Sequence, residues 1–187
     1  MDSSRRAFFM TLLAMTLLVS VGSADEKASS DGSVTLTDGT WKDVETLVAK
    51  HAGKVVVVDL WSTACLPCMT EFPNLVALQN AHTDKIVCIS FNLDYAGIKN
   101  KGPDYYRPKV ETFLKKNKAN FTNFLCTVAA DKMFEDLELS SIPAVYVFGK
   151  DGKLAKRFDD SLLEEGKEEA FNYKHDINPF VEKLLEK

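Results

Sequence analysis

The stretch Val55-Val-Val-Val-Asp-Leu-Trp-Ser-Thr-Ala-Cys-Leu-Pro-Cys68 contains the signals that decide the fold. Its first half, residues 55–61, is apolar at almost every position, which predicts a central β-strand covered by helices on both faces. Its second half contains two cysteines separated by two residues. Apolar residues at helical spacing follow from there, which predicts a helix over residues 65–82. The pattern predicts a buried strand that leads into a helix with Cys-x-x-Cys at its start.

A Cys-x-x-Cys pair can bind a metal, form a structural disulfide or carry out redox exchange. A zinc site needs four ligands, and His51, His82 and His175 have no spacing that would complete one. A disulfide between Cys65 and Cys68 would close a very short loop and would therefore remove little chain entropy. We interpret the pair as a dithiol for redox exchange.

Cys65 is expected to be the nucleophile of this dithiol. Its place at the start of a helix directs free backbone N–H groups at its sulfur, and the helix dipole favours a thiolate there. Pro67 suits the first turn because it has no N–H to lose. Cys68, one turn further along, is expected to attack the mixed disulfide formed by Cys65 and to release the reduced partner.

Two acidic residues are candidates for proton transfer. Asp59 is the one polar residue of the strand at 55–61, so burial should raise its pKa toward neutrality and allow it to deprotonate Cys68, directly or through a water. The alternative is an aspartate that hydrogen-bonds a nearby amide. Glu71 follows Cys68 by three residues on the same helical face and is the second acid/base candidate, with a solvated surface charge as its alternative.

The remaining chain alternates predicted strands and helices and ends in a hairpin and a last helix. Strands are expected at 34–37, 86–93, 121–128, 144–148 and 154–158, helices at 41–51, 108–118, 129–139 and 179–185, a loop at 95–107 and a turn at 149–152. This order predicts an α/β three-layer sandwich, with a mixed central sheet and helices on both faces. Residues 159–175, rich in Glu and Lys, are expected to form a solvated helix or loop.

Several motifs together resemble the thioredoxin fold over residues 34–187. They are the strand 58–61, the pair Cys65-Leu-Pro-Cys68, and Ile142-Pro143 followed by a hairpin that contains Lys150-Asp-Gly152. The finer pattern C-x-x-C-x-x-E-x-P, which begins at Cys65, is similar to the exported TlpA/ResA-like family of thiol-disulfide oxidoreductases.

The resemblance implies roles for residues away from the cysteines. Pro143 would form a cis peptide bond and face the reactive sulfur, and the backbone of Ile142 would pair with an extended substrate. Trp61 matches the inner tryptophan of the family and is assigned to the substrate-binding part of the site, packed beneath it. Ala64 stands where the family usually has a tryptophan, so a flat apolar contact beside the nucleophile is absent.

The start of the chain is typical of an export signal. Residues 1–24 combine Arg5-Arg6 with an uncharged apolar run at 7–21, which predicts a twin-arginine-like signal peptide, with an ordinary secretory signal as the alternative. An uncleaved membrane anchor is a further alternative, which the run disfavours because it is shorter than the ~20 residues of a spanning helix. No stable membrane insertion is expected after cleavage. Residues 25–33 are expected to be a flexible linker, and 34–187 the thioredoxin-like domain. We expect an exported protein, periplasmic or otherwise extracytoplasmic.

Charge and cysteine content indicate the class of partner. The net charge of −4 argues against a nucleic-acid partner. Export would expose the four cysteines to an oxidising compartment, where disulfide chemistry is available. Cys88 and Cys126 lie in apolar segments and are expected to be buried, unreactive thiols, with a second disulfide as the alternative.

These observations predict an exported thiol-disulfide oxidoreductase. It would exchange disulfides with protein substrates and electrons with a redox partner protein, without a cofactor or a metal. Two other functions stay open on the same fold: a thiol peroxidase, and a copper-binding or redox-inert binding module.

Overall fold

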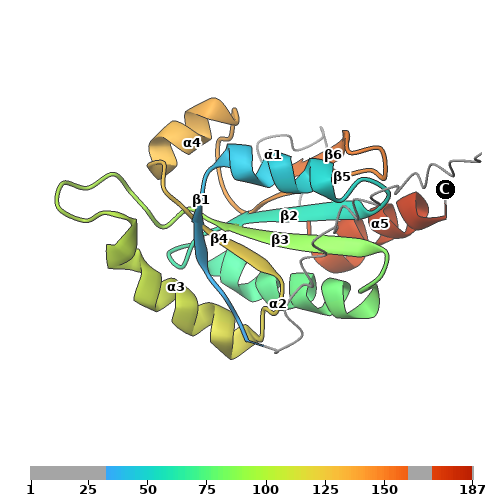
Figure 1. Ribbon diagram of the computed structural model, residues 1–187, viewed down its shortest axis with the longest axis horizontal. Coiled ribbons are helices and arrows are strands. Elements are labelled where there is room, and N and C mark those ends of the chain that lie inside the picture. The colour runs from blue at the N-terminus through green and yellow to red at the C-terminus, as the bar shows by residue number, and fades with distance from the viewer. Residues whose placement is uncertain (1–32, 160–169, 187) are drawn as a thin grey trace, which may run out of the picture. The chain divides into compact units, whose positions relative to one another are not determined.

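The computed structural model describes residues 33–159 and 170–186 (Figure 1). The predicted signal peptide and the predicted linker, apart from Ser33, lie outside the described residues. Within the described ranges, no helix is long and apolar enough to cross a membrane.

Six strands of the described chain form one mixed sheet in the order β1-β4-β3-β2-β5-β6. The strands are β1 (Thr37–Gly39), β2 (Val55–Trp61), β3 (Ile86–Asn92), β4 (Thr122–Cys126), β5 (Ala144–Phe148) and β6 (Leu154–Asp159). The first four in this order pair in parallel, whereas β5 runs antiparallel to β2 and β6 antiparallel to β5. Every residue of β2 is buried, as its apolar sequence predicts for a central strand.

Helices cover both faces of the sheet (Figure 1). They are α1 (Trp41–Lys50), α2 (Leu66–Ala81), α3 (Pro103–Asn117), α4 (Ala130–Asp136), α5 (Asn178–Leu185) and a π-helix, η2 (Tyr173–Ile177). Alternate residues of β2 belong to two separate apolar cores: Val55 and Val57 pack with α2, α3, η2 and α5, and Val56 and Val58 pack with α1 and α4. The predicted three-layer α/β sandwich with a mixed central sheet is confirmed.

The main differences from the predicted elements concern where β1 and α3 begin and end. Strand β1 covers Thr37–Gly39 rather than 34–37, because its ladder with β4 is confined to three pairs that start at Thr37 and Phe124. Helix α3 begins at Pro103, so part of the predicted loop at 95–107 is helical. Pro103 occupies the first turn, where the missing N–H of proline leaves no helical hydrogen bond unmade.

The segment before the last helix also differs from the prediction of a solvated helix or loop at 159–175. Residues 160–169 of that segment lie outside the described residues. Phe171 and Tyr173 are buried in the core that contains α2, and a π-helix precedes α5. This end of the chain is therefore part of the domain interior and reaches the functional site.

Candidate active site

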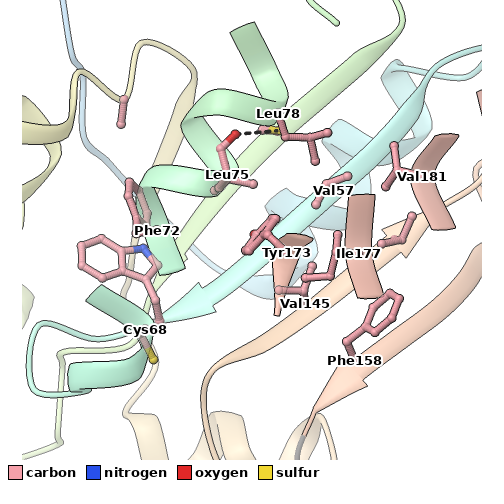
Figure 2. Close-up of a cluster of buried hydrophobic side chains, with 14 of the residues drawn as sticks. Val57, Cys68, Phe72, Leu75, Leu78, Val145, Phe158, Tyr173, Ile177 and Val181 are labelled. Carbon is pink, nitrogen blue, oxygen red and sulfur yellow. Dashed lines mark hydrogen bonds between the residues drawn. The ribbon is translucent and has the colours of Figure 1, made fainter. Parts of the chain in front are cut away.

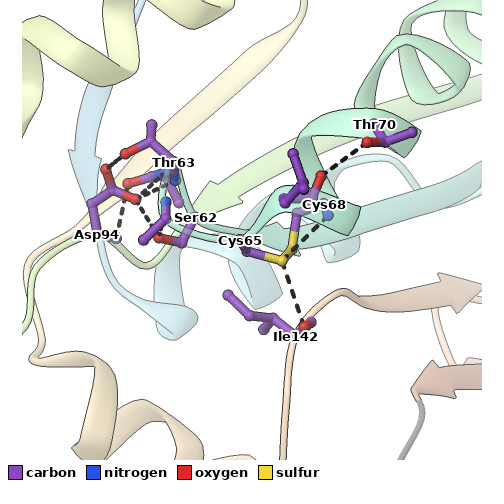
Figure 3. Close-up of a disulfide and its surroundings, with 10 residues drawn as sticks. Ser62, Thr63, Cys65, Cys68, Thr70, Asp94 and Ile142 are labelled. Carbon is purple, nitrogen blue, oxygen red and sulfur yellow. Dashed lines mark hydrogen bonds between the residues drawn. A yellow bond between two sulfur atoms is a disulfide. The ribbon is translucent and has the colours of Figure 1, made fainter.

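The two cysteines lie where β2 passes into α2 (Figure 3). Cys65 is the N-cap of α2, its sulfur accepts a hydrogen bond from the backbone N–H of Cys68 at 3.2 Å, and Pro67 occupies the first turn. The two sulfurs form a disulfide. The predicted helix start at the Cys-x-x-Cys pair is confirmed, and so is the direction of a backbone N–H at the Cys65 sulfur.

The two sulfurs differ in how easily a partner can reach them. Cys65 is half-buried, whereas the side chain of Cys68 is 2% exposed. Leu66, between them, is 71% exposed and offers an apolar surface beside the disulfide. A protein partner therefore meets the sulfur of Cys65 first.

Ile142 and Pro143 lie opposite the cysteines, immediately before β5. Their peptide bond is cis, as expected. The carbonyl oxygen of Ile142 is 3.6 Å from the Cys65 sulfur, so the backbone before the cis proline borders the disulfide (Figure 3). Ile142 is half-buried and Pro143 is buried.

The loop that leads to Cys65 is held by a buried carboxylate that sequence reasoning missed. Asp94, 8% exposed, accepts hydrogen bonds from the hydroxyl of Ser62 at 2.7 Å and from the backbone N–H of Thr63 at 2.6 Å. The hydroxyl of Thr63 and the amide of Asn92 also donate to it. The sequence contained a signal for this role. Asp94 follows the carboxyl end of β3, which is parallel to β2, so it lies at the same end of the sheet as the loop that leads from β2 to Cys65.

Asp59 is buried, as predicted, and its partner is a tyrosine. Its side chain is 4% exposed, and the phenol of Tyr173 donates a 2.6 Å hydrogen bond to its Oδ2. Burial raises the pKa of Asp59 from 3.8 to about 7, the Tyr173 hydrogen bond opposes this rise, and the nearby charge of Glu71 adds to it. The expected shift of the Asp59 pKa toward neutrality is confirmed.

Glu71 is half-buried rather than a solvated surface charge. Its Oε2 accepts a hydrogen bond from the backbone N–H of Tyr173 at 3.1 Å and one from the amide of Asn74 at 3.2 Å. Both predicted acid/base residues therefore contact Tyr173, which lies among apolar side chains beside β2 (Figure 2). The aromatic residues 171 and 173 were the signal in a segment otherwise rich in charge.

Trp61 lies under the site with no exposed surface. Its indole N–H donates to the hydroxyl of Ser90 at 2.9 Å, and its ring centroid is 4.8 Å from those of Phe72 and Phe113. Trp61 therefore supports the site from within the core. Because none of its surface is exposed, a docked substrate cannot touch it, and the predicted substrate-binding role does not fit.

The other two cysteines are buried free thiols, as expected. Cys88 and Cys126 belong to the cores on opposite faces of the sheet, so the alternative of a disulfide between them is wrong. Burial raises the pKa of the Cys126 thiol to about 11 and that of Cys88 still further. Within the described ranges, no group of three or more His, Cys, Asp or Glu side chains is arranged to hold a metal ion.

Comparison with known proteins agrees with this geometry. No family model matches the chain. Over 177 residues the chain is 25% identical to the thiol-disulfide oxidoreductase ResA of Bacillus subtilis, a match that covers 88% of this chain and 90% of ResA. Over 138 residues it is 28% identical to NHL repeat-containing protein 2 of Bos taurus, which covers 71% of this chain but only 18% of that protein.

Among solved structures, the chain is similar to an exposed lipoprotein thioredoxin from Streptococcus pneumoniae. The TM-score is 0.52 at 20% identity, over 73% of this chain and 90% of that one. The likeness establishes a thioredoxin fold, and the match to ResA extends over nearly the whole chain.

Proposed function

We propose that this chain, a thioredoxin-fold protein similar to ResA, is a thiol-disulfide oxidoreductase that exchanges disulfides with protein substrates through Cys65 and Cys68. The observation that carries the proposal is the disulfide at the start of α2, with one accessible sulfur and one buried sulfur. A disulfide across so short a loop contributes little to stability, so its position at a helix N-terminus suits exchange.

In the reducing direction, the thiolate of Cys65 attacks one sulfur of a substrate disulfide. The Cys65–substrate bond forms as the substrate S–S bond breaks, and the first substrate thiolate leaves. The thiolate of Cys68 then attacks the Cys65 sulfur, which forms the Cys65–Cys68 disulfide and releases the second substrate thiolate. Two electrons and two protons pass to the substrate, and the oxidising direction is the reverse of these steps.

Asp59 is the proposed acceptor of the Cys68 proton. A buried carboxyl with a pKa of about 7 exists in both protonation states at neutral pH, so it can take a proton and later return it. Glu71 is the proposed second acid/base group, because its charge lies close enough to affect Asp59 and its carboxylate is partly accessible. We assign the step from Cys68 to Asp59 to a direct transfer or to one intervening water.

The proposed substrate surface lies at Ile142 and Pro143. The backbone before the cis proline borders the Cys65 sulfur, so an extended peptide paired with Ile142 would place its own cysteine at the point of attack. Protein substrates also suit the exposed side chain of Leu66, which offers apolar contact beside the disulfide.

The proposed location is outside the cytoplasm, periplasmic or otherwise extracytoplasmic. Support comes from the signal-like sequence of residues 1–24 and from the match to ResA over most of the chain. In an oxidising compartment the Cys65–Cys68 pair needs a second protein that reduces or reoxidises it after each turnover. A redox partner protein therefore belongs to the proposal.

Covalent trapping tests the function. The variant Cys68→Ser should accumulate mixed disulfides with a reporter protein disulfide through Cys65, and dithiothreitol should release them. The matched control Cys126→Ser, whose hydroxyl can bond the carbonyl of Val128 as the thiol does, should turn over without trapping. Recovery of no adduct with Cys68→Ser, together with peroxide consumption that depends on Cys65, would replace the proposal with a peroxidase.

A further inference from the structure

We propose that Tyr173 is a positioning residue, which holds the Asp59 carboxyl in the orientation and charge state needed to accept the proton of Cys68. The inference rests on the proposed function and extends the site to the end of the chain. Tyr173 comes from η2, a segment whose sequence carries no redox motif.

The contact between the two side chains is buried on both sides. The phenol oxygen of Tyr173 is 2.6 Å from Oδ2 of Asp59, and the two side chains are 1% and 4% exposed. Apolar side chains of the core surround the contact, and Figure 2 shows part of them around Tyr173. A hydrogen bond to a charged group is strongest in such surroundings, because the local dielectric constant is low.

The backbone of Tyr173 fixes the position of its phenol. Its N–H donates to Oε2 of Glu71, which ties η2 to α2. The preceding residue, Asn172, accepts a hydrogen bond from the N–H of His175 at 2.9 Å and donates one to Asp176 at 3.0 Å. The turn that carries the phenol is thus bonded within itself and to the helix that carries Cys68.

The phenol also acts against the other influences on Asp59. The titratable groups that act on it are Tyr173 from η2, Glu71 from α2 and Cys88 from β3. Cys68 of α2 joins them only when its disulfide with Cys65 is reduced. A charge on Glu71 makes a charge on Asp59 less favourable, as does burial. The phenol O–H donates a hydrogen bond to the carboxylate and so stabilises its charged form.

The strands beside β2 add no further charge, because Asp59 pairs with Ser90 on β3 and with Val145 on β5. The charged residues of η2 next to Tyr173, Lys174 and His175, are exposed. Without the phenol, Asp59 would take up its proton at a higher pH and would be a carboxylate in fewer molecules at pH 7.

The test is Tyr173→Phe, with Tyr146→Phe as the matched control. The phenol of Tyr146 contacts the carbonyl of Leu137 at 3.5 Å in the core on the other face of the sheet. Titration of ¹³C-labelled aspartate by NMR should show the Asp59 midpoint raised by about one pH unit in Tyr173→Phe and unchanged in Tyr146→Phe. The pH profile of the exchange rate should move by the same amount.

Three outcomes separate the inference from the proposed function. An unmoved Asp59 midpoint in Tyr173→Phe, or a moved midpoint with an unmoved rate profile, would overturn the inference while wild-type exchange still stood. Failure of the wild-type protein to exchange disulfides at any pH would overturn the proposed function itself. If the phenylalanine variant does not fold, 3-fluorotyrosine at position 173 keeps the shape and donates more strongly, so the midpoint should fall, and an unchanged midpoint would again overturn the inference.

Discussion

Replacement of Asp59 by asparagine should stabilise the protein, increasingly so as the pH rises. Asparagine has nearly the shape of a protonated aspartate, and its carbonyl oxygen can still accept the hydrogen bond from Tyr173. It carries no charge at any pH. The variant therefore removes the cost of ionising a carboxyl group inside the core, while it leaves the packing around β2 in place.

The size of the effect follows from proton linkage. Burial raises the pKa of Asp59 from 3.8 to about 7, so between these values the folded protein binds more protons than the unfolded chain. Stability then falls as the pH rises, by about 1.4 kcal/mol for each unit between the two pKa values. Over about three units the wild type loses about 4 kcal/mol that Asp59→Asn does not lose.

Urea unfolding of both proteins with the disulfide intact, from pH 4 to pH 8, measures this difference directly. Contributions from other groups cancel in the comparison, and the gain should grow across the range and level off above pH 7. Asp84→Asn is the control, because Asp84 is exposed and its replacement should give no pH-dependent gain. A stability difference between Asp59→Asn and wild type that is the same at pH 4 and pH 8 would refute the reasoning.

Two further substitutions and one labelling experiment test the loop before Cys65 and the packing of the domain. Asp94→Ala leaves the buried N–H and hydroxyl of Thr63 without their acceptor, so unfolding should cost about 2 kcal/mol less and exchange should slow; wild-type stability in urea would contradict this. Gly39→Ala would place a methyl group 2.5 Å from the ring of Phe124 and should destabilise the domain by about 1–3 kcal/mol, which an unchanged urea midpoint would disprove. Cys126 should resist iodoacetamide in the folded, reduced protein and react after unfolding, and modification at the rate of a free thiol before unfolding would count against its burial.

The core of the fold was predictable where local pattern and tertiary role agree. Residues 55–61 are apolar at every position except Asp59, a pattern that suits the centre of a sheet covered on both faces, and β2 occupies that place. Cys65 and Pro67 combine a helix cap with a first-turn residue, and α2 starts there. The cis bond before Pro143 came from the family resemblance, because nothing in the residues near it distinguishes cis from trans.

Local composition was misleading where proline and glycine take helical positions. Residues 95–107 contain two glycines and one proline and resemble a loop, but α3 begins at Pro103, with Gly102 as its N-cap. Proline is unfavourable in the interior of a helix but suits its first turn, so composition alone does not distinguish a loop from a helix start.

The missed site residues share a different cause. The hydrogen bond from Tyr173 to Asp59 joins residues 114 positions apart, and the one from Thr63 to Asp94 spans 31. Such contacts arise only when the sheet and helices have assembled, and they leave no periodic trace in the sequence. A buried aspartate predicts that some donor exists, and the fold decides which residue supplies it.

The central claim is that Cys65 is the reactive thiol because it caps α2 beside the cis proline. Alkylation of the reduced protein across the pH range, with the modified residue identified by mass spectrometry, tests it most directly. We expect Cys65 to react first, with a half-maximal rate below the pH of about 8.5 at which an ordinary thiol ionises. Slower reaction of Cys65 than of Cys68, or a half-maximal rate at or above that pH, would contradict the claim.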